Sequence, residues 1–203
     1  MTAHAEREGR DERPRRIADS PGRRTGVWFI GARGSVATTA TAGCAAIAAG
    51  LHPPTGMVTE TPPFADTGLP PLTSLVFGGH DTLDCPLAKR AEALAEGGVL
   101  PYRLPTAVRA ELDAADAEIR PGGPLPGETR TDQELIAAFA ADLTDFAHRN
   151  ELTRTVVINV SSTEPAPAPD DPRLPASSLY AAAALRAGCS YANFTPSTGL
   201  RAP

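Results

Sequence analysis

Short apolar runs alternate with longer segments of helical spacing along most of the chain. The runs 26–30, 75–77 and 155–160 are unbroken stretches of aliphatic, aromatic and β-branched residues, typical of strands covered on both faces of a parallel sheet. Apolar residues recur every three or four positions over 132–148, which predicts a helix with one apolar stripe. Small apolar residues fill 35–50 and predict a buried helix directly after the first strand. This alternation predicts an α/β fold with a Rossmann-like, doubly wound, mostly parallel sheet.

Capping and turn residues predict where several elements begin and end. Ser35 is the expected N-cap of the helix over 35–50, and Gly50 is its expected stop. The segment 131–134 has the residues of a helix cap. The two glycines that follow the run 75–77 predict a turn over 78–81.

Weaker patterns predict the remaining elements. Helices are expected over 86–96 and 174–187, the second ending at Gly188, and a last short strand is expected over 191–194. The Pro-rich stretch 51–72 is expected to be mostly loop, with a short strand only at 56–59.

A glycine-rich turn joins the first strand to the first helix. Gly31 and Gly34 allow a tight turn, and they let the amide hydrogens of a helix N-terminus face a pyrophosphate. A purely structural turn between strand and helix would favour the same glycines, so both interpretations stay open on these residues alone. Arg33 stands where the usual dinucleotide motif has glycine, and it either covers the phosphates or points to solvent.

Two carboxylates are candidates for binding a ribose. Glu60 follows Gly34 at a suitable distance along the chain, but its Pro-rich surroundings are not a clean strand end. Asp81 is the better candidate because it directly follows the expected strand end, although an aspartate that only forms a turn is also compatible with this position. A metal cluster is disfavoured because the spacing fits no zinc site; its members would be His80, Asp81, Asp84 and Cys85.

Composition narrows the classes of function. A formal net charge of −5 argues against broad nucleic-acid binding, and no apolar stretch approaches the roughly 20 residues that span a bilayer. Three scattered cysteines without a Cys-x-x-Cys pair favour a reducing cytoplasm. Residues 1–24 contain seven arginines and five acids but almost no aliphatic side chains, which predicts a disordered tail. The sequence has no Gly-x-Ser-x-Gly elbow, and no paired carboxylates flank a plausible cleft, so redox or cofactor-assisted chemistry is favoured over hydrolysis.

Several segments in a fixed order resemble the inositol-3-phosphate synthase family, particularly its compact bacterial kind. The resemblance covers about 25–203 and is carried by five short motifs. These motifs are Ile30-Gly31-Ala32-Arg33-Gly34-Ser35-Val36-Ala37, Phe77-Gly78-Gly79-His80-Asp81, Asn159-Val160-Ser161-Ser162-Thr163-Glu164, Ser178-Leu179-Tyr180-Ala181 and Asn193-Phe194-Thr195-Pro196-Ser197.

The resemblance implies an NAD-dependent isomerase that converts glucose 6-phosphate to myo-inositol 3-phosphate by oxidation, enolisation, aldol closure and reduction. It also implies a homo-oligomer, a tetramer, for the full-length protein. By matching position, the expected contacts to the pyrophosphate come from Gly31, Ala32, Arg33, Gly34, Ser35 and Val36. Asp81 would bind the adenosine ribose, and the nicotinamide end would be lined by Ser161, Ser162, Thr163 and Thr195.

The family's catalytic lysines have no counterpart here, because Lys89 is the single lysine of the chain and matches none of them. A developing enolate in a water-poor site needs such fixed cations. We therefore expect an NAD-binding domain over 25–203 that is incomplete at its C-terminal side and inactive alone, with the catalytic residues beyond Pro203. The alternatives are an NAD(P)-dependent dehydrogenase domain and a non-catalytic nucleotide-binding module.

Overall fold

The computed structural model describes residues 23–64, 67–165 and 172–201. The tail predicted for 1–24 lies outside this part of the chain, except for its last two residues. Arg24 already begins the first strand, which therefore starts two residues earlier than the apolar run at 26–30 indicated.

Five parallel strands form the central sheet in the order β3-β2-β1-β4-β5. They are β1 (Arg24–Ile30), β2 (Leu75–Asp81), β3 (Ile119–Pro121), β4 (Leu152–Asn159) and β5 (Ser190–Asn193). The chain builds outward from β1 to β2 and β3, then crosses to the other side of β1 and adds β4 and β5. This order confirms the predicted doubly wound α/β fold, with every described strand parallel.

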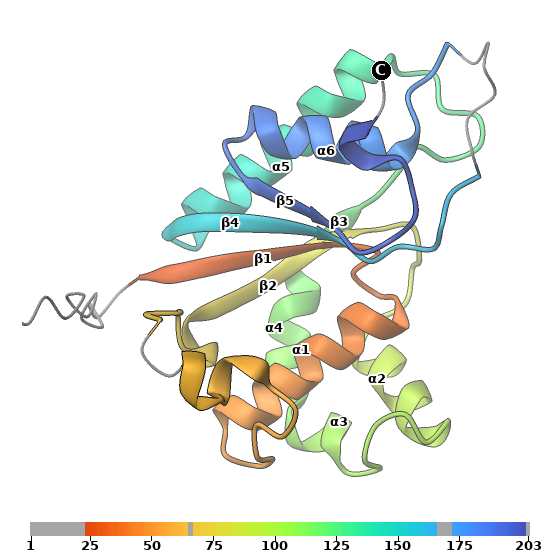
Figure 1. Ribbon diagram of the computed structural model, residues 1–203. Coiled ribbons are helices and arrows are strands. Elements are labelled where there is room, and N and C mark those ends of the chain that lie inside the picture. Colours follow the sequence, from red (N-terminus) through yellow and green to blue (C-terminus); the bar gives the residue numbers. More distant parts are fainter. Residues whose placement is uncertain (1–22, 65–66, 166–171, 202–203) are drawn as a thin grey trace, which may run out of the picture.

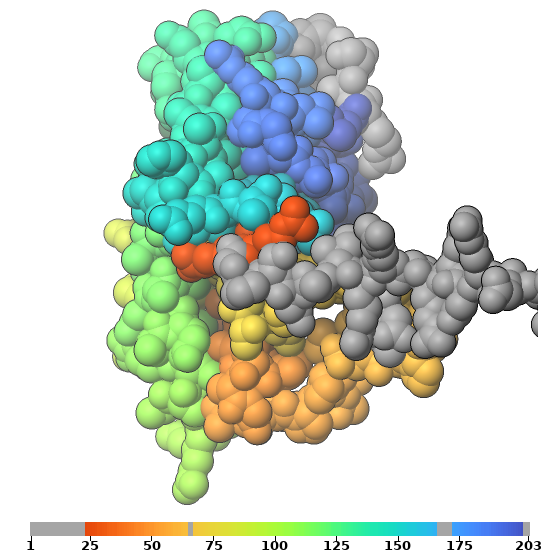
Figure 2. Space-filling view, turned by 90° about the vertical axis from the view of Figure 1, so that its left-hand side faces the viewer, coloured from red at the N-terminus to blue at the C-terminus, as the bar shows by residue number. Residues whose placement is uncertain are grey.

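Helices cover both faces of the sheet (Figure 1). On one side of the sheet lie α1 (Ser35–Ala48), α2 (Leu87–Glu96), α3 (Leu104–Ala107) and α4 (Arg109–Ala117), and on the other lie α5 (Asp132–Arg149) and α6 (Ala176–Arg186). Each face has its own apolar cluster, because alternate side chains of β1 point to opposite sides: Val27 and Phe29 pack toward α1, and Trp28 and Ile30 toward α5. In the space-filling view the red start of β1 emerges between these two layers (Figure 2).

The predicted ends of several helices are confirmed. Thr131 accepts a hydrogen bond from the amide of Glu134, whose carboxylate accepts one from the amide of Thr131, which is a capping box for α5. Gly50 and Gly188 follow α1 and α6 with positive φ angles of 69° and 71°, the backbone conformation that glycine adopts at lowest cost. The prediction that Ser35 is the N-cap of α1 is wrong, because Gly34 is the N-cap and Ser35 is the first helical residue.

We expect Thr131→Ala to lower the free energy of unfolding by about 0.5–2 kcal/mol, because it removes the acceptor for one end-of-helix amide. Urea denaturation followed by circular dichroism measures this loss. Thr129→Ala, a change at an exposed position two residues before the cap, is the control and should leave stability unchanged. Equal stability of wild type and Thr131→Ala would contradict a contribution from the cap.

Two local predictions are wrong. Residues 78–81 do not form a turn; they are the second half of β2, where Gly79 pairs with Phe29 and His80 with Ile30. A Cβ atom at position 79 would lie 2.2 Å from the carbonyl oxygen of Phe29, so glycine is required by the close approach of two strands. The strand expected at 56–59 is absent too, since the 3₁₀ helix η1 (Val58–Glu60) occupies that place.

The remainder of the Pro-rich stretch forms two more 3₁₀ helices, η2 (Pro62–Phe64) and η3 (Leu72–Ser74), and a fourth, η4 (Gly199–Arg201), follows β5. No sequence pattern predicted α3, α4 or β3. The strand β3 has three residues, of which only Ile119 is buried, so it is too short to show a period.

Candidate functional site

The carboxyl ends of β1 and β4 meet at the point where the strand order reverses. The amide of Val160 donates to the carbonyl of Ile30 at 3.1 Å, which joins the two strand exits. A Cβ atom at position 31 would lie 2.9 Å from the Cα atom of Ser161, so the two following loops are in direct contact. In open α/β sheets, ligands bind in the crevice at this switch point.

The loop after β1 presents an uncapped helix N-terminus to this crevice. The amides of Gly31 and Ala32 donate to the carbonyl of His80 at 2.9 and 3.2 Å, and the amide of Gly34 donates to the carbonyl of Gly31 at 3.0 Å. The helix that follows has no side-chain cap and no acidic residue in its first turn. Within the described chain, we find no hydrogen-bond acceptor for the amides of Ser35, Val36 and Ala37. Three unpaired donors at a helix N-terminus are suited to an anion such as a pyrophosphate.

Arg33 is held against the neighbouring helices. Its guanidinium donates to Asp116 of α4 at 3.1 Å and to the carbonyl of Leu83 at 2.9 Å, and its side chain is 15% exposed. Its carbonyl in turn accepts a hydrogen bond from Arg90 of α2 at 3.0 Å. The alternative in which the Arg33 side chain points to solvent is therefore wrong, and contact of this side chain with a phosphate stays a prediction.

The carboxylate of Asp81 joins the ends of β1 and β2. It accepts the amide of Arg33 at 2.6 Å through one oxygen and the amide of Leu83 at 2.8 Å through the other. Each oxygen retains a second lone pair, so the predicted contact with a ribose hydroxyl stays open. The rival carboxylate Glu60 lies in η1, beyond the far end of α1, and a 14-residue helix is about 20 Å long (Figure 1). Glu60 is thus remote from the loop.

A buried asparagine organises the exit of β4. Asn159 is fully buried; its side-chain oxygen accepts from the hydroxyl of Ser161 at 2.7 Å, and its side-chain amide donates to Asn193 at 3.2 Å and to Thr195 at 3.4 Å. This contact network brings together Ser161 and Thr195, which the sequence predicted for the nicotinamide end. The other two predicted residues of this exit, Ser162 and Thr163, are exposed.

Glu164, the last residue of the same motif, holds the start of α6. Its carboxylate accepts the amide of Ser177 at 3.0 Å, the hydroxyl of Ser177, and the amide of Thr198 at 3.3 Å. The carboxylate therefore caps α6, whose own N-cap residue, Pro175, supplies no side-chain cap. Sequence reasoning missed the roles of Asn159 and Glu164 because most of their partners lie 13 or more residues further along the chain.

Comparison with known proteins identifies the domain. A family model described as myo-inositol-1-phosphate synthase, covering the NAD-binding domain, matches residues 25–121 and 124–203. The chain belongs to the myo-inositol-1-phosphate synthase family. A search of curated protein sequences finds no match.

The inositol-3-phosphate synthase of Caenorhabditis elegans has a similar crystal structure, with a TM-score of 0.67 and 19% sequence identity. The alignment covers 88% of this chain and 46% of that chain, so the present chain spans about half the length of this structural relative. The likeness confirms the fold.

In this family member, both ring nitrogens of the buried His80 side chain have hydrogen-bond partners within the protein. Its Nδ1 atom lies 3.0 Å from the indole nitrogen of Trp28, and its Nε2 atom lies 3.0 Å from the carboxylate of Asp142 on α5. Both ring nitrogens therefore have partners within the protein, so the side chain of His80 is not available as a ligand of the metal cluster considered above. Among the described residues, no group of three potential metal ligands lies together.

The same burial makes stability depend on pH. Burial lowers the pKa of His80 below its ordinary value of 6.5, while Asp142 opposes this shift and the charge of Arg120 adds to it. A histidine with a lowered pKa takes up its proton more readily in the unfolded chain. The contribution of neutral His80 to the free energy of unfolding is therefore complete above pH 6.5 and declines as the pH falls below 6.5.

We expect the free energy of unfolding to decrease between pH 6.5 and 5.5, by at most about 1.4 kcal/mol from this one group. Urea denaturation at both pH values measures the change. His148→Gln, at an exposed position on α5, should keep the decrease, whereas His80→Gln should reduce it. A decrease of the same size in His80→Gln would contradict the assignment to His80.

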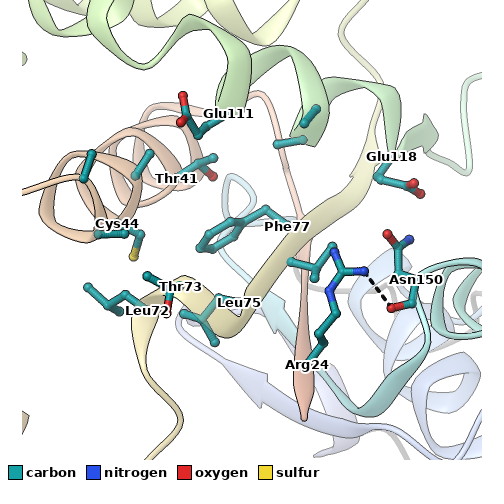
Figure 3. A pocket seen from close by; sticks show the side chains of 16 residues that line it. Arg24, Thr41, Cys44, Leu72, Thr73, Leu75, Phe77, Glu111, Glu118 and Asn150 are labelled. Atoms are coloured by element: carbon teal, nitrogen blue, oxygen red, sulfur yellow. Dashed lines mark hydrogen bonds between the residues drawn. The ribbon is translucent and has the colours of Figure 1, made fainter. Parts of the chain in front are cut away.

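A cavity of about 520 Å³ lies away from the predicted NAD site (Figure 3). It is lined by the later part of α1, including Cys44, by the first half of β2, including Phe77, and by α4, with Arg24 and Asn150 at one side. The strand residues that line the cavity lie at the amino ends of β1 and β2, whereas the loop 31–34, the predicted phosphate loop, follows the carboxyl end of β1. The cavity is therefore not the crevice at the switch point.

In the described part of the chain, no helix combines the length and apolar character that crossing a membrane requires.

Proposed function

We propose that this chain binds NAD at the switch point, with the pyrophosphate against the N-terminus of α1. The observation that carries the proposal is the set of three unpaired amides, those of Ser35, Val36 and Ala37, beside the exit of β4. Charge favours the same position, since the first turn of α1 has no acidic residue that would repel a phosphate. The loop residues Gly31, Ala32, Arg33 and Gly34 shape this site around the amides.

We assign the two ends of the cofactor by the same geometry. Asp81 would accept a hydroxyl of the adenosine ribose, because it stands at the end of β2 beside the loop. The nicotinamide end would lie on the other side of the loop, against Ser161, Ser162, Thr163 and Thr195. Asn159 holds Ser161 and Thr195 in place there through its buried side chain.

We further propose that the protein to which this domain belongs isomerises glucose 6-phosphate to myo-inositol 3-phosphate. When bound, NAD supplies a hydride acceptor that is regenerated within each turnover. The residues of this domain would bind and orient the cofactor and exclude water from its reactive end, while fixed cations for the enolate would come from elsewhere in the protein. We also propose a homo-oligomer, a tetramer, in the cytoplasm.

Calorimetric titration with NAD tests the binding proposal. Gly34 has a φ angle of −70°, which any residue can adopt, but a Cβ atom there would lie 3.0 Å from the carbonyl oxygen of Gly31. We therefore expect Gly34→Val to weaken NAD binding at least about tenfold, because the side chain narrows the space over the loop. Gly43→Val, in α1 where a Cβ atom meets nothing within 4 Å, is the control and should keep wild-type affinity.

Failure of the wild-type chain to bind NAD would contradict the proposal. For the isomerisation, incubation of the full-length protein with NAD and glucose 6-phosphate should yield inositol phosphate without net accumulation of NADH. Accumulating NADH would instead support a dehydrogenase.

A further inference from the structure

The neutral ring of His80 is fixed in one tautomer and one orientation. The indole nitrogen of Trp28 can only donate a hydrogen bond, so Nδ1 of His80 is the acceptor in the 3.0 Å contact between them. The hydrogen of the neutral ring must then be on Nε2, from which it is donated to Asp142 at 3.0 Å. The rings of Phe139 and Tyr180 pack against the imidazole with centroid distances of 4.9 and 5.3 Å. The side chain has no second arrangement that satisfies both partners.

The backbone of the same residue holds the phosphate loop. The carbonyl of His80 accepts the amides of both Gly31 and Ala32, and the carboxylate of the next residue, Asp81, accepts the amide of Arg33. Three consecutive loop amides are thus bound by two consecutive residues of β2. These bonds direct the loop so that the next free donors are the first amides of α1.

We propose that His80 is a positioning residue for NAD, and that Asp142 acts through it. Asp142 belongs to α5, which lies on the side of the sheet opposite to α1. The inference rests on the proposed NAD site, because His80 and Asp142 would affect NAD binding through the loop that forms that site. Neither side chain needs to touch the cofactor. Asp142 orients the imidazole, the imidazole and Trp28 fix the end of β2, and the carbonyl of His80 sets the position of Gly31 and Ala32.

Asp142 offers the cleaner test because its side chain is 36% exposed, whereas that of His80 is completely buried. We expect Asp142→Leu to weaken NAD binding about tenfold, measured by calorimetry at pH 7.5. Asp142→Asn retains a side-chain oxygen that can accept the Nε2 hydrogen, so its affinity should stay within about twofold of wild type. Asp145→Leu, on the same helix at a 55% exposed position, is the control and should bind NAD as wild type does.

A second readout is independent of NAD. Trp28 is the single tryptophan of the chain, so its fluorescence reports on the contact with His80. The emission should change in Asp142→Leu but not in Asp142→Asn or Asp145→Leu. Wild-type NAD affinity in Asp142→Leu, or an equal loss of affinity in Asp142→Asn, would overturn the inference and leave the proposed NAD site intact. Absence of NAD binding by the wild-type chain would overturn both.

Discussion

Gly31→Ala is expected to weaken NAD binding at least about tenfold, which corresponds to about 1.4 kcal/mol. Gly31 has a φ angle of 84°, a conformation that costs other residues about 1–3 kcal/mol. A Cβ atom there would also lie 2.9 Å from the Cα atom and 3.1 Å from the amide nitrogen of Ser161. The added methyl group must therefore push the phosphate loop away from the exit of β4. Calorimetric titration with NAD measures the effect.

Gly188→Ala separates this steric effect from the backbone strain. Gly188 has a similar φ angle of 71° after α6, but a Cβ atom there meets nothing within 4 Å. The control variant should lose stability through the same strained conformation and keep wild-type affinity for NAD. If Gly31→Ala bound NAD as tightly as Gly188→Ala, contact between the two loops would not matter for the cofactor.

The largest loss of stability is expected for Gly79→Ala, at least about 4 kcal/mol. The new Cβ atom would lie 2.2 Å from the carbonyl oxygen of Phe29 and 2.5 Å from the Cβ atom of Ala32. Both atoms belong to the central strand or to the loop that follows it, so neither can move aside without disturbing the sheet. Urea denaturation measures the free energy of unfolding, or shows that the variant does not fold.

Gly43→Ala provides the matched control. Gly43 lies within α1 with open space around its Cα atom, and alanine favours a helix over glycine by about 1 kcal/mol. This variant should be as stable as wild type or slightly more stable. Wild-type stability of Gly79→Ala would show that β1 and β2 are not packed as closely as described.

The strong periodic signals in the sequence predicted most of the fold. The apolar runs that became β1 and β4 are unbroken, and the helical spacing of α5 extends over several turns, so these three elements can be recognised directly. The short strand β3 and the helices before it escaped prediction because few of their residues are buried. Gly78 and Gly79 were misread as a turn because a sequence cannot distinguish a glycine that bends the chain from one that lets another strand approach.

The candidate site was predicted in outline. The phosphate loop and the exit of β4 were recognised from motifs, and the structure brings them together. The partners that hold them were not predicted, because they come from distant positions: Arg33 is bound by Asp116, and His80 by Asp142. Such pairs depend on how the helices pack against the strands and loops, which no local pattern encodes.

The central claim is the position of the cofactor at the switch point, and amide chemical shifts of the isotope-labelled chain test it most directly. On titration with NAD, the largest shifts are expected for the amides of Ser35, Val36 and Ala37, accompanied by those of Ser161 and its neighbours. Shifts confined to the residues around Cys44 and Phe77, which line the separate cavity, would contradict the account.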